Sequence, residues 1–264
     1  MNLDLSHKHI LITGGSKGIG LSCAQVFLAE GAKVSLVSRD PANLAAARKT
    51  LEKDFAPENI FTVAADLRDA QAAVVALDGA EAALGAVDVL VNSAGAAKRT
   101  PAAELTPQAW LDAMQAKYFS YIHMIDPVIK RMAARGQGNI VNVVGNGGKV
   151  ASAIHIPGGA ANAALMLASA GLATAYAAQG IRVNAVNPGL TYTDRLNEGF
   201  AADARVQGIS PEDIMRNAVA RIPLGRMASP EEVANAVVFL ASSKASYITG
   251  ISMSMDGALN PIVV

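Results

Sequence analysis

Thr13-Gly14-Gly15-Ser16-Lys17-Gly18-Ile19-Gly20 is the stretch that decides the fold, because it joins an apolar run at 9–12 to an amphipathic run at 21–30. Glycines lack a Cβ and let backbone N–H groups approach a pyrophosphate, while the positive end of the following helix dipole favours the phosphates. Three residues separate Gly14 from Gly18, so the spacing departs from G-x-G-x-x-G. The stretch predicts a dinucleotide site, with an ordinary strand-to-helix turn as the alternative.

The rest of the chain alternates apolar runs with helical stretches. Gly31 ends the first helix, and a second apolar run at 34–37 completes a strand-helix-strand unit. Five further runs lie at 60–65, 87–91, 139–144, 181–186 and 250–255. This alternation predicts an α/β fold: a single doubly wound Rossmann-type domain over 1–264, with a seven-stranded parallel sheet and helices on both faces. The segment at about 190–217 is expected to form a helical lid over the substrate.

Composition limits the classes of partner. Lys and Arg number 22, Asp and Glu also number 22, and no Lys/Arg run is present, which argues against nucleic acid and an anionic membrane. The one cysteine, Cys23, and the lack of a signal-like apolar segment in the first ten residues predict a cytoplasmic protein. The four histidines do not fall at metal-ligand spacing, so no metal site is expected.

The segment 150–181 carries no charged residue, which raises the question of a membrane span. It is rich in alanine, which supplies little transfer free energy, so we do not expect it to span. A helix at 160–179 that is apolar nearly all round should be buried on more than one side. The sheet covers one side, and a second helix or subunit must cover the other. We therefore expect a homodimer or homotetramer that buries this helix or its long neighbour at 110–132.

Six sequence signals, in this order, resemble the short-chain dehydrogenase/reductase family over nearly the whole chain. They are the turn at 13–20, Ala65-Asp66-Leu67, Asn92-Ser93-Ala94-Gly95, Asn187-Pro188-Gly189 with Thr193, the segment 221–226, and the tail from Thr249-Gly250 to Asp256-Gly257. The resemblance implies that Asp66 lies near the adenine, that 92–95 supports the ribose side, and that Pro188, Gly189 and Thr193 hold the nicotinamide carboxamide. Taken singly, Asp66 also suits a helix cap and Asn92 a turn.

The end of the second strand indicates which cofactor is bound. An NAD site places a carboxylate there to receive the ribose 2′-OH, whereas an NADP site needs a cation for the 2′-phosphate. Ser38 stands at the carboxylate's place, Arg39 follows it, and Lys17 is a second cation, while Asp40 is expected to cap the next helix. We expect NADP(H) in preference to NAD(H); the alternative is that Arg39 is an exposed surface charge. The predicted cofactor residues are Gly14, Ser16, Lys17, Gly18, Ile19, Gly20, Ser38, Arg39, Asp66, Leu67, Asn92, Ala94, Gly95, Pro188, Gly189 and Thr193.

The resemblance also implies where the reaction centre lies. The family uses a Ser, a Tyr and a Lys, with an Asn from the preceding long helix, and the lysine ammonium lowers the proton affinity of the tyrosine. Aligning 138–144 on this pattern puts Gly145 at the serine position, Gly158 at the tyrosine, Asn162 at the lysine and Lys117 at the asparagine. The sequence therefore predicts a non-standard active site.

The ammonium and the amide have exchanged helices, and we expect Lys117 and Asn162 to face each other across the pocket. The alternative is that Lys117 turns outward and Asn162 is a buried helix polar group. His155 and Tyr192 are the candidate proton donors, although a lone histidine also suits a structural role. Tyr118 and Tyr121 are expected to pack or to lie at a subunit contact.

Three functions fit these residues. The first is an NADP(H)-dependent oxidoreductase that acts on a carbonyl or alcohol substrate with Lys117, His155 and Asn162 as catalytic residues. The second is a catalytically inactive pseudoenzyme that binds NADP(H) as a sensor or scaffold. The third is a non-redox catalyst that uses the same pocket.

Overall fold

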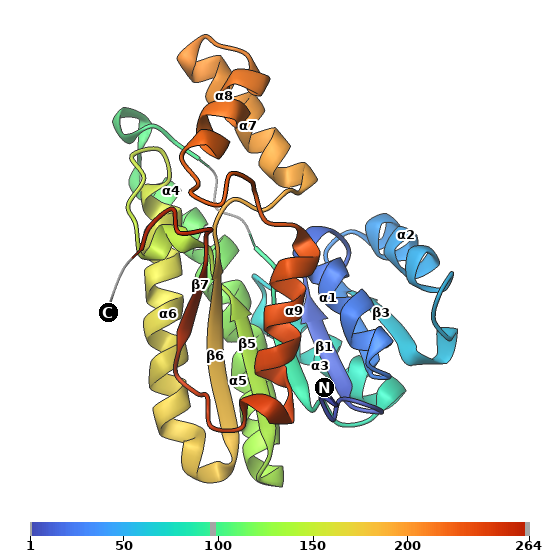
Figure 1. Cartoon of the computed structure of the whole chain (residues 1–264). Helices are drawn as coiled ribbons and strands as arrows, with labels where there is room; N and C mark the ends of the chain where they lie inside the picture. Colours follow the sequence, from blue (N-terminus) through green and yellow to red (C-terminus); the bar gives the residue numbers. More distant parts are fainter. Residues whose placement is uncertain (1, 96–98, 262–264) are drawn as a thin grey trace.

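The computed structural model describes residues 2–95 and 99–261 (Figure 1). The seven strands are β1 (His9–Thr13), β2 (Lys33–Ser38), β3 (Ile60–Ala64), β4 (Val89–Asn92), β5 (Gly138–Val143), β6 (Ile181–Pro188) and β7 (Ser252–Met255). They form one sheet in the order β3-β2-β1-β4-β5-β6-β7, and every neighbouring pair is parallel. The predicted sheet is confirmed.

Helices connect these strands. The first group is α1 (Gly18–Ala29), α2 (Pro41–Leu51), α3 (Ala70–Leu84), α4 (Pro107–Ala113), the π-helical turn η3 (Met114–Phe119) and α5 (Ser120–Arg135). The second is α6 (Ile156–Tyr176), α7 (Asp194–Gln207), α8 (Pro211–Ala220) and α9 (Pro230–Ala241). Short 3-10 turns are η1 (Pro57–Asn59), η2 (Ala102–Glu104), η4 (Asn146–Gly148), η5 (Ala177–Gln179) and η6 (Ser243–Ala245).

Both faces of the sheet are covered, because successive side chains of each strand point to opposite faces. In β1, Ile10 and Ile12 pack with α1 and α9, whereas Leu11 packs with α3 and α5. All three side chains are fully buried. This explains why the strands read as continuous apolar runs rather than as alternating ones. The doubly wound arrangement is therefore confirmed.

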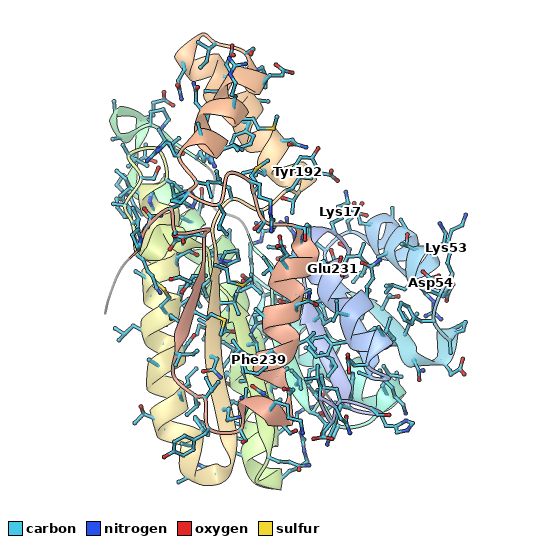
Figure 2. The ribbon with its side chains drawn as sticks, viewed as in Figure 1. Lys17, Lys53, Asp54, Tyr192, Glu231 and Phe239 are labelled. Carbon is cyan, nitrogen blue, oxygen red and sulfur yellow. The ribbon has the colours of Figure 1, made fainter. Side chains whose placement is uncertain are left out.

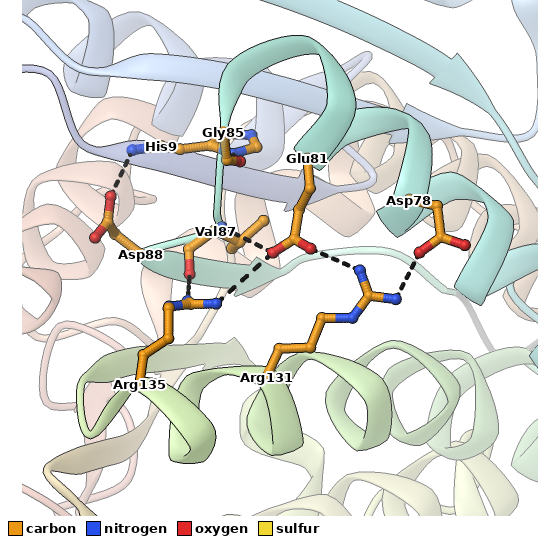
Figure 3. Close-up of polar contacts among 8 residues, drawn as sticks. All are labelled: His9, Asp78, Glu81, Gly85, Val87, Asp88, Arg131 and Arg135. Atoms are coloured by element: carbon orange, nitrogen blue, oxygen red, sulfur yellow. Dashed lines mark hydrogen bonds and ion pairs between the residues drawn. The ribbon is translucent and has the colours of Figure 1, made fainter.

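The strand order reverses between β1 and β4, which places the crevice of the fold at the carboxyl ends of these two strands. The opposite end of the sheet carries a polar cluster (Figure 3). There the His9 ring lies between the Gly85 carbonyl, at 2.6 Å, and the Ser35 hydroxyl, at 2.8 Å. Burial holds the pKa of His9 below its ordinary value. Arg131 of α5 forms ion pairs with Asp78 and Glu81 of α3, so the contacts at this end hold the two helices together.

Helix α6 begins at Ile156, one turn earlier than the predicted 160–179. Pro157 stands in its first turn, where its missing N–H has no intrahelical partner to lose. Among the described residues, the helical stretch Ile156–Gln179 alone is long and apolar enough to cross a membrane, a test that core helices also pass. Its inner face, including Leu165 and Ala173, is buried, but Leu167 is 77% exposed. The second buried side that the sequence predicts is therefore uncovered in the single chain.

Helices α7 and α8 pack on each other above the carboxyl ends of the strands, through Phe200, Ala204 and Ile214 (Figure 1). An ion pair between Arg99 and Asp203 joins α7 to the segment after β4. The residues of these two helices make up most of the segment 190–217, which the sequence predicts to be a lid. That the helices act as a lid stays a prediction.

Candidate active site

At Gly14 and Gly20, the glycine turn packs too closely on its neighbours for a side chain to fit. A Cβ at Gly14, whose φ is +68°, would lie 2.8 Å from the Ala94 backbone, and a Cβ at Gly20 would lie 2.3 Å from the Gly14 carbonyl oxygen. Lys17 is the N-cap of α1 and is exposed, and its side chain makes no capping hydrogen bond (Figure 2). The first N–H groups of α1 are thus open to an anion, which suits a pyrophosphate.

A pocket next to this turn brings together seven of the predicted cofactor residues: Gly14, Ser38, Arg39, Asp66, Leu67, Ala94 and Gly95. Val37, Ala65, Arg68, Ala116 and Ser120 complete its lining and were missed by the sequence reasoning. Ser16 donates to the Ser38 hydroxyl at 3.0 Å, and Gly18 and Ile19 form the start of α1.

The charges in this pocket are coupled. The Arg68 guanidinium Nε lies 3.0 Å from both carboxylate oxygens of Asp66, and its Nη2 lies 2.5 Å from one of them. These bonds, with a smaller contribution from nearby Arg39, hold the pKa of Asp66 below its usual range. The pocket therefore presents two guanidinium groups and one ionised carboxylate. Asp40 accepts from Ala42 N at 2.8 Å, which confirms it as the cap of α2.

The segment predicted to hold the nicotinamide lies next to the glycine turn, where Thr193 approaches Gly18. Thr193 Cγ2 lies 3.4 Å from the position that a Cβ would take at Gly18, and Thr193 also caps α7. Pro188 ends β6, and Gly189 packs so closely on Asp256 that a Cβ would lie 2.8 Å from the Asp256 Cβ. The chain from β6 to α7 therefore runs beside the start of α1.

Asn92 has a different position from that of a pocket residue. Its side chain is fully buried, accepts from Thr13 Oγ1 at 3.2 Å and donates to Asn142 Oδ1 at 3.0 Å. Asn142 in turn donates to Ser169 Oγ at 2.9 Å. This chain of hydrogen bonds ties β1, β4, β5 and α6 together, so Asn92 supports the crevice through the strands that it joins.

Lys117 lies in the π-helical turn η3 and is directed inward. Its Nζ donates to the Tyr121 hydroxyl at 2.8 Å and to the Val143 carbonyl at 3.2 Å. It also lies 4.4 Å from the centre of the Tyr121 ring. The ammonium therefore lies at the carboxyl end of β5. Its acceptor there, Val143, precedes Gly145 by two residues.

Asn162 approaches the same end of β5 from α6. It is 5% exposed, and its Nδ2 lies 3.2 Å from the position that a Cβ would take at Gly145. Within the described ranges 2–95 and 99–261, its Oδ1 has no hydrogen-bond partner. Because η3 packs against α6, Lys117 and Asn162 belong to elements that lie side by side. An amide with spare hydrogen-bonding capacity thus borders the place of the family serine.

His155 joins this group. His155 is the N-cap of α6. A Cβ placed at Gly147 would lie 3.6 Å from the His155 ring Cδ2 and 3.8 Å from Asn162 Nδ2. His155 precedes the first residue of α6, and Asn162 lies about two turns further along the chain, within the helix. Gly158 between them is buried.

Lys149 and Tyr192 are two further residues whose side chains can carry a proton. Lys149 donates to Ser252 O and Ser254 Oγ, each at 2.9 Å, and is thus directed toward β7. Tyr192 is 58% exposed beside Thr193 (Figure 2). Of the candidate proton donors, His155 is the one whose contacts place it with Asn162.

The fold and these contacts define a dinucleotide-binding protein of Rossmann type. A family model described as Enoyl-(Acyl carrier protein) reductase matches residues 14–260. The chain belongs to the short-chain dehydrogenase/reductase family of oxidoreductases, which confirms the resemblance.

Individual relatives cover nearly the whole chain. The chain is 31% identical over 262 residues to the 3alpha-hydroxysteroid dehydrogenase of Mediterraneibacter gnavus, covering 98% of this chain and 99% of that protein. The crystal structure of L-sorbose reductase from Gluconobacter frateurii, complexed with NADPH and L-sorbose, has a TM-score of 0.92, with 30% identity and 100% of each chain covered. An NADPH-bound short chain oxidoreductase from Pseudomonas aeruginosa, described as containing an atypical catalytic center, has a TM-score of 0.89, with 32% identity and coverage of 98% and 99%.

Proposed function

We propose that the protein is an NADP(H)-dependent oxidoreductase that interconverts a carbonyl compound and its alcohol by a non-standard active site. The observation that carries the proposal is the pocket at the carboxyl end of β2, where Ser38 and Arg39 stand in place of a carboxylate. The guanidinium of Arg39 suits the 2′-phosphate, and the N–H groups at the start of α1 suit the pyrophosphate. The NADPH-bound structures of two relatives support this choice of cofactor.

Bound NADPH would supply the hydride, and the residues of this chain would provide for the substrate oxygen. Asn162 Nδ2, which lies beside Gly145, would donate a hydrogen bond to that oxygen. His155, at the N-terminus of α6, would give up the proton that the resulting alkoxide needs. Lys117 adds a positive charge at the end of β5, which stabilises negative charge that develops on the oxygen.

NADPH oxidation in the presence of carbonyl compounds tests this function. A useful panel contains a ketose, a β-ketoacyl thioester, a cyclic ketone and a steroid ketone, with loss of nicotinamide absorbance as the signal. Saturable oxidation of NADPH with one of these classes is expected. Tight NADPH binding without turnover on any of them would instead favour a pseudoenzyme that acts as a sensor or scaffold.

The exchanged pair provides a second test. If Lys117 and Asn162 act on one pocket, Lys117→Asn and Asn162→Lys should each lower kcat/KM, and the double variant should recover part of the loss. Coupled neighbours commonly differ from additivity by about 1 to 2 kcal/mol, which corresponds to roughly 5- to 30-fold in kcat/KM. Steady-state kinetics on the best substrate give the four values. A double variant that loses the full sum of the two single losses would contradict the exchange.

We also propose that the chain assembles as a homodimer or homotetramer. The outer face of α6 exposes Leu167, and an apolar groove along α4 is lined by Leu105, Thr106, Pro107, Trp110, Leu111 and Met114. Because α4 packs against α6, these side chains belong to neighbouring helices of the single chain. Burial of such a surface between subunits would cover the side of α6 that the sheet leaves open.

Light scattering with Leu167→Glu checks this assembly. The wild-type protein should have the mass of a dimer or tetramer at micromolar concentration, and Leu167→Glu should shift it toward the monomer, because a buried carboxylate at a contact is costly. Val75→Glu is the matched control, since Val75 is 59% exposed on α3. A wild-type monomer would rule the assembly out.

A further inference from the structure

We infer that Tyr121 is a positioning residue for Lys117, holding its ammonium at the carboxyl end of β5. The inference rests on the proposed function, in which Lys117 supplies positive charge to the active site. The Tyr121 hydroxyl donates to the Val143 carbonyl at 2.6 Å and accepts from Lys117 Nζ at 2.8 Å. Lys117 Nζ donates to the same carbonyl at 3.2 Å, so the three groups form a closed triangle.

A tyrosine at this position needs an explanation beyond packing. Tyr121 is fully buried in the core formed by α3, α5 and α6, and a phenylalanine would fill nearly the same volume. Burying a hydroxyl is unfavourable unless it forms hydrogen bonds, and here both its donor and its acceptor are used. The acceptor is used by Lys117. The hydroxyl therefore has a partner whose charge matters to the pocket.

Lys117 is the kind of residue that needs such a partner. A lysine ammonium sits on a flexible four-carbon stem, so fixing its position costs considerable side-chain entropy. Two oxygen acceptors and the face of the Tyr121 ring, 4.4 Å from Nζ, supply the interactions that offset this cost. All three also favour the charged form of the amine. Without the hydroxyl, the ammonium loses this acceptor and is less restricted.

The backbone at Lys117 is adapted to this position. The Ser120 hydroxyl, at the start of α5, lies 3.1 Å from the carbonyl oxygens of both Ala116 and Lys117 in the π-helical turn. The turn also packs closely on Gly95, where a Cβ would lie 2.3 Å from the Ala116 carbonyl oxygen. Ala116 and Ser120 line the cofactor pocket. Lys117 therefore extends from a turn that forms part of the pocket wall, and π-helical turns are frequent at functional sites.

A spectroscopic measurement tests the contact without requiring turnover. Lysines are labelled with ¹³C-methyl groups, and the Lys117 signal is identified by its absence in Lys117→Met. In Tyr121→Phe, the Lys117 pKa is expected to fall by about 0.5 to 1, the equivalent of one hydrogen bond to the charged form. Tyr118→Phe, one residue after Lys117, is the control and should leave that pKa unchanged. An unchanged Lys117 pKa in Tyr121→Phe would overturn the inference.

A kinetic cycle then separates positioning from general structural support. Tyr121→Phe should lower kcat/KM about 5- to 10-fold in the wild-type background and have little effect in the Lys117→Met background. Equal losses in both backgrounds would show a structural role and contradict the inference. If the Lys117 pKa falls in Tyr121→Phe but Lys117→Met retains full activity, the positioning contact is supported and the proposed catalytic role of Lys117 is rejected. If no substrate of the panel is turned over, NADPH affinity is measured in the same cycle.

Discussion

Replacement of Arg39 by Asp is expected to weaken NADPH binding by about 1.5 to 3 kcal/mol, the scale of a charge-assisted phosphate contact, while sparing NADH. This corresponds to roughly 10- to 150-fold in Kd. Arg39 is exposed at the edge of the pocket that also contains Ser38 and Asp66. A carboxylate at this position would repel the 2′-phosphate and could accept from the ribose 2′-OH of NADH.

The neighbouring contacts explain why this effect should be large. Asp40, the next carboxylate along the chain, is engaged as the cap of α2, with its oxygen 2.8 Å from Ala42 N. Ser38 is bonded to Ser16 and carries no charge. Arg68 already shares its guanidinium with Asp66. Arg39 is therefore the cation of this pocket whose charge is most available for a phosphate.

Fluorescence titration with both cofactors measures the change. Lys49→Asp, a charge reversal at another exposed residue near the end of α2, is the matched control and should change neither affinity by more than about two-fold, because exposed charges at a distance are screened. The wild-type protein should bind NADPH more tightly than NADH. Equal wild-type affinities would reject the cofactor preference.

The part of the site that could be predicted depends on the geometry of parallel strands. The carboxyl ends of β1, β2, β3 and β4 meet at one edge of the sheet, so residues that follow these strands in the sequence come together in space. Gly14, Arg39, Asp66 and Ala94 each follow one of these strands, and all four line one pocket. Strands β1, β2 and β4 were predictable because both of their faces are buried.

The pocket residues that the sequence did not predict are placed by structural features that the pattern of apolar residues does not indicate. Ala116 and Ser120 reach the pocket because η3 is a π-helical turn, and a repeat of 3.6 residues gives no sign of one. Tyr121 was expected to pack, which it does, but its hydrogen bond with Lys117 was missed. The four-residue spacing of these two side chains on a helix was the available signal. The predicted start of α6 was too late because Pro157, Gly158 and Gly159 all have low helix propensity, although a proline is tolerated in the first turn.

The identity of the proton donor is a question that the sequence left open between His155 and Tyr192, and the structure narrows it by contact. His155 lies over Gly147, which Asn162 also approaches, whereas Tyr192 is mostly exposed. A protonated imidazole can donate a proton to an alkoxide, which is the step that carbonyl reduction requires. We therefore propose His155 as the proton donor beside Asn162.

Replacing His155 by Gln is therefore expected to lower kcat by about 10²- to 10⁴-fold, the usual contribution of a general acid, with the Kd of NADPH changed less than about two-fold. Glutamine keeps a hydrogen-bond donor of similar reach but cannot transfer a proton, and His155 makes no side-chain capping bond to α6 that the change would remove. Steady-state kinetics and cofactor titration give both values. His7→Asn is the control, because His7 is exposed and has a positive φ of 64° that asparagine tolerates. If His155→Gln retains kcat within about two-fold of the wild type, the alkoxide must take its proton from water or from another group, and His155 then has only a structural role at the start of α6.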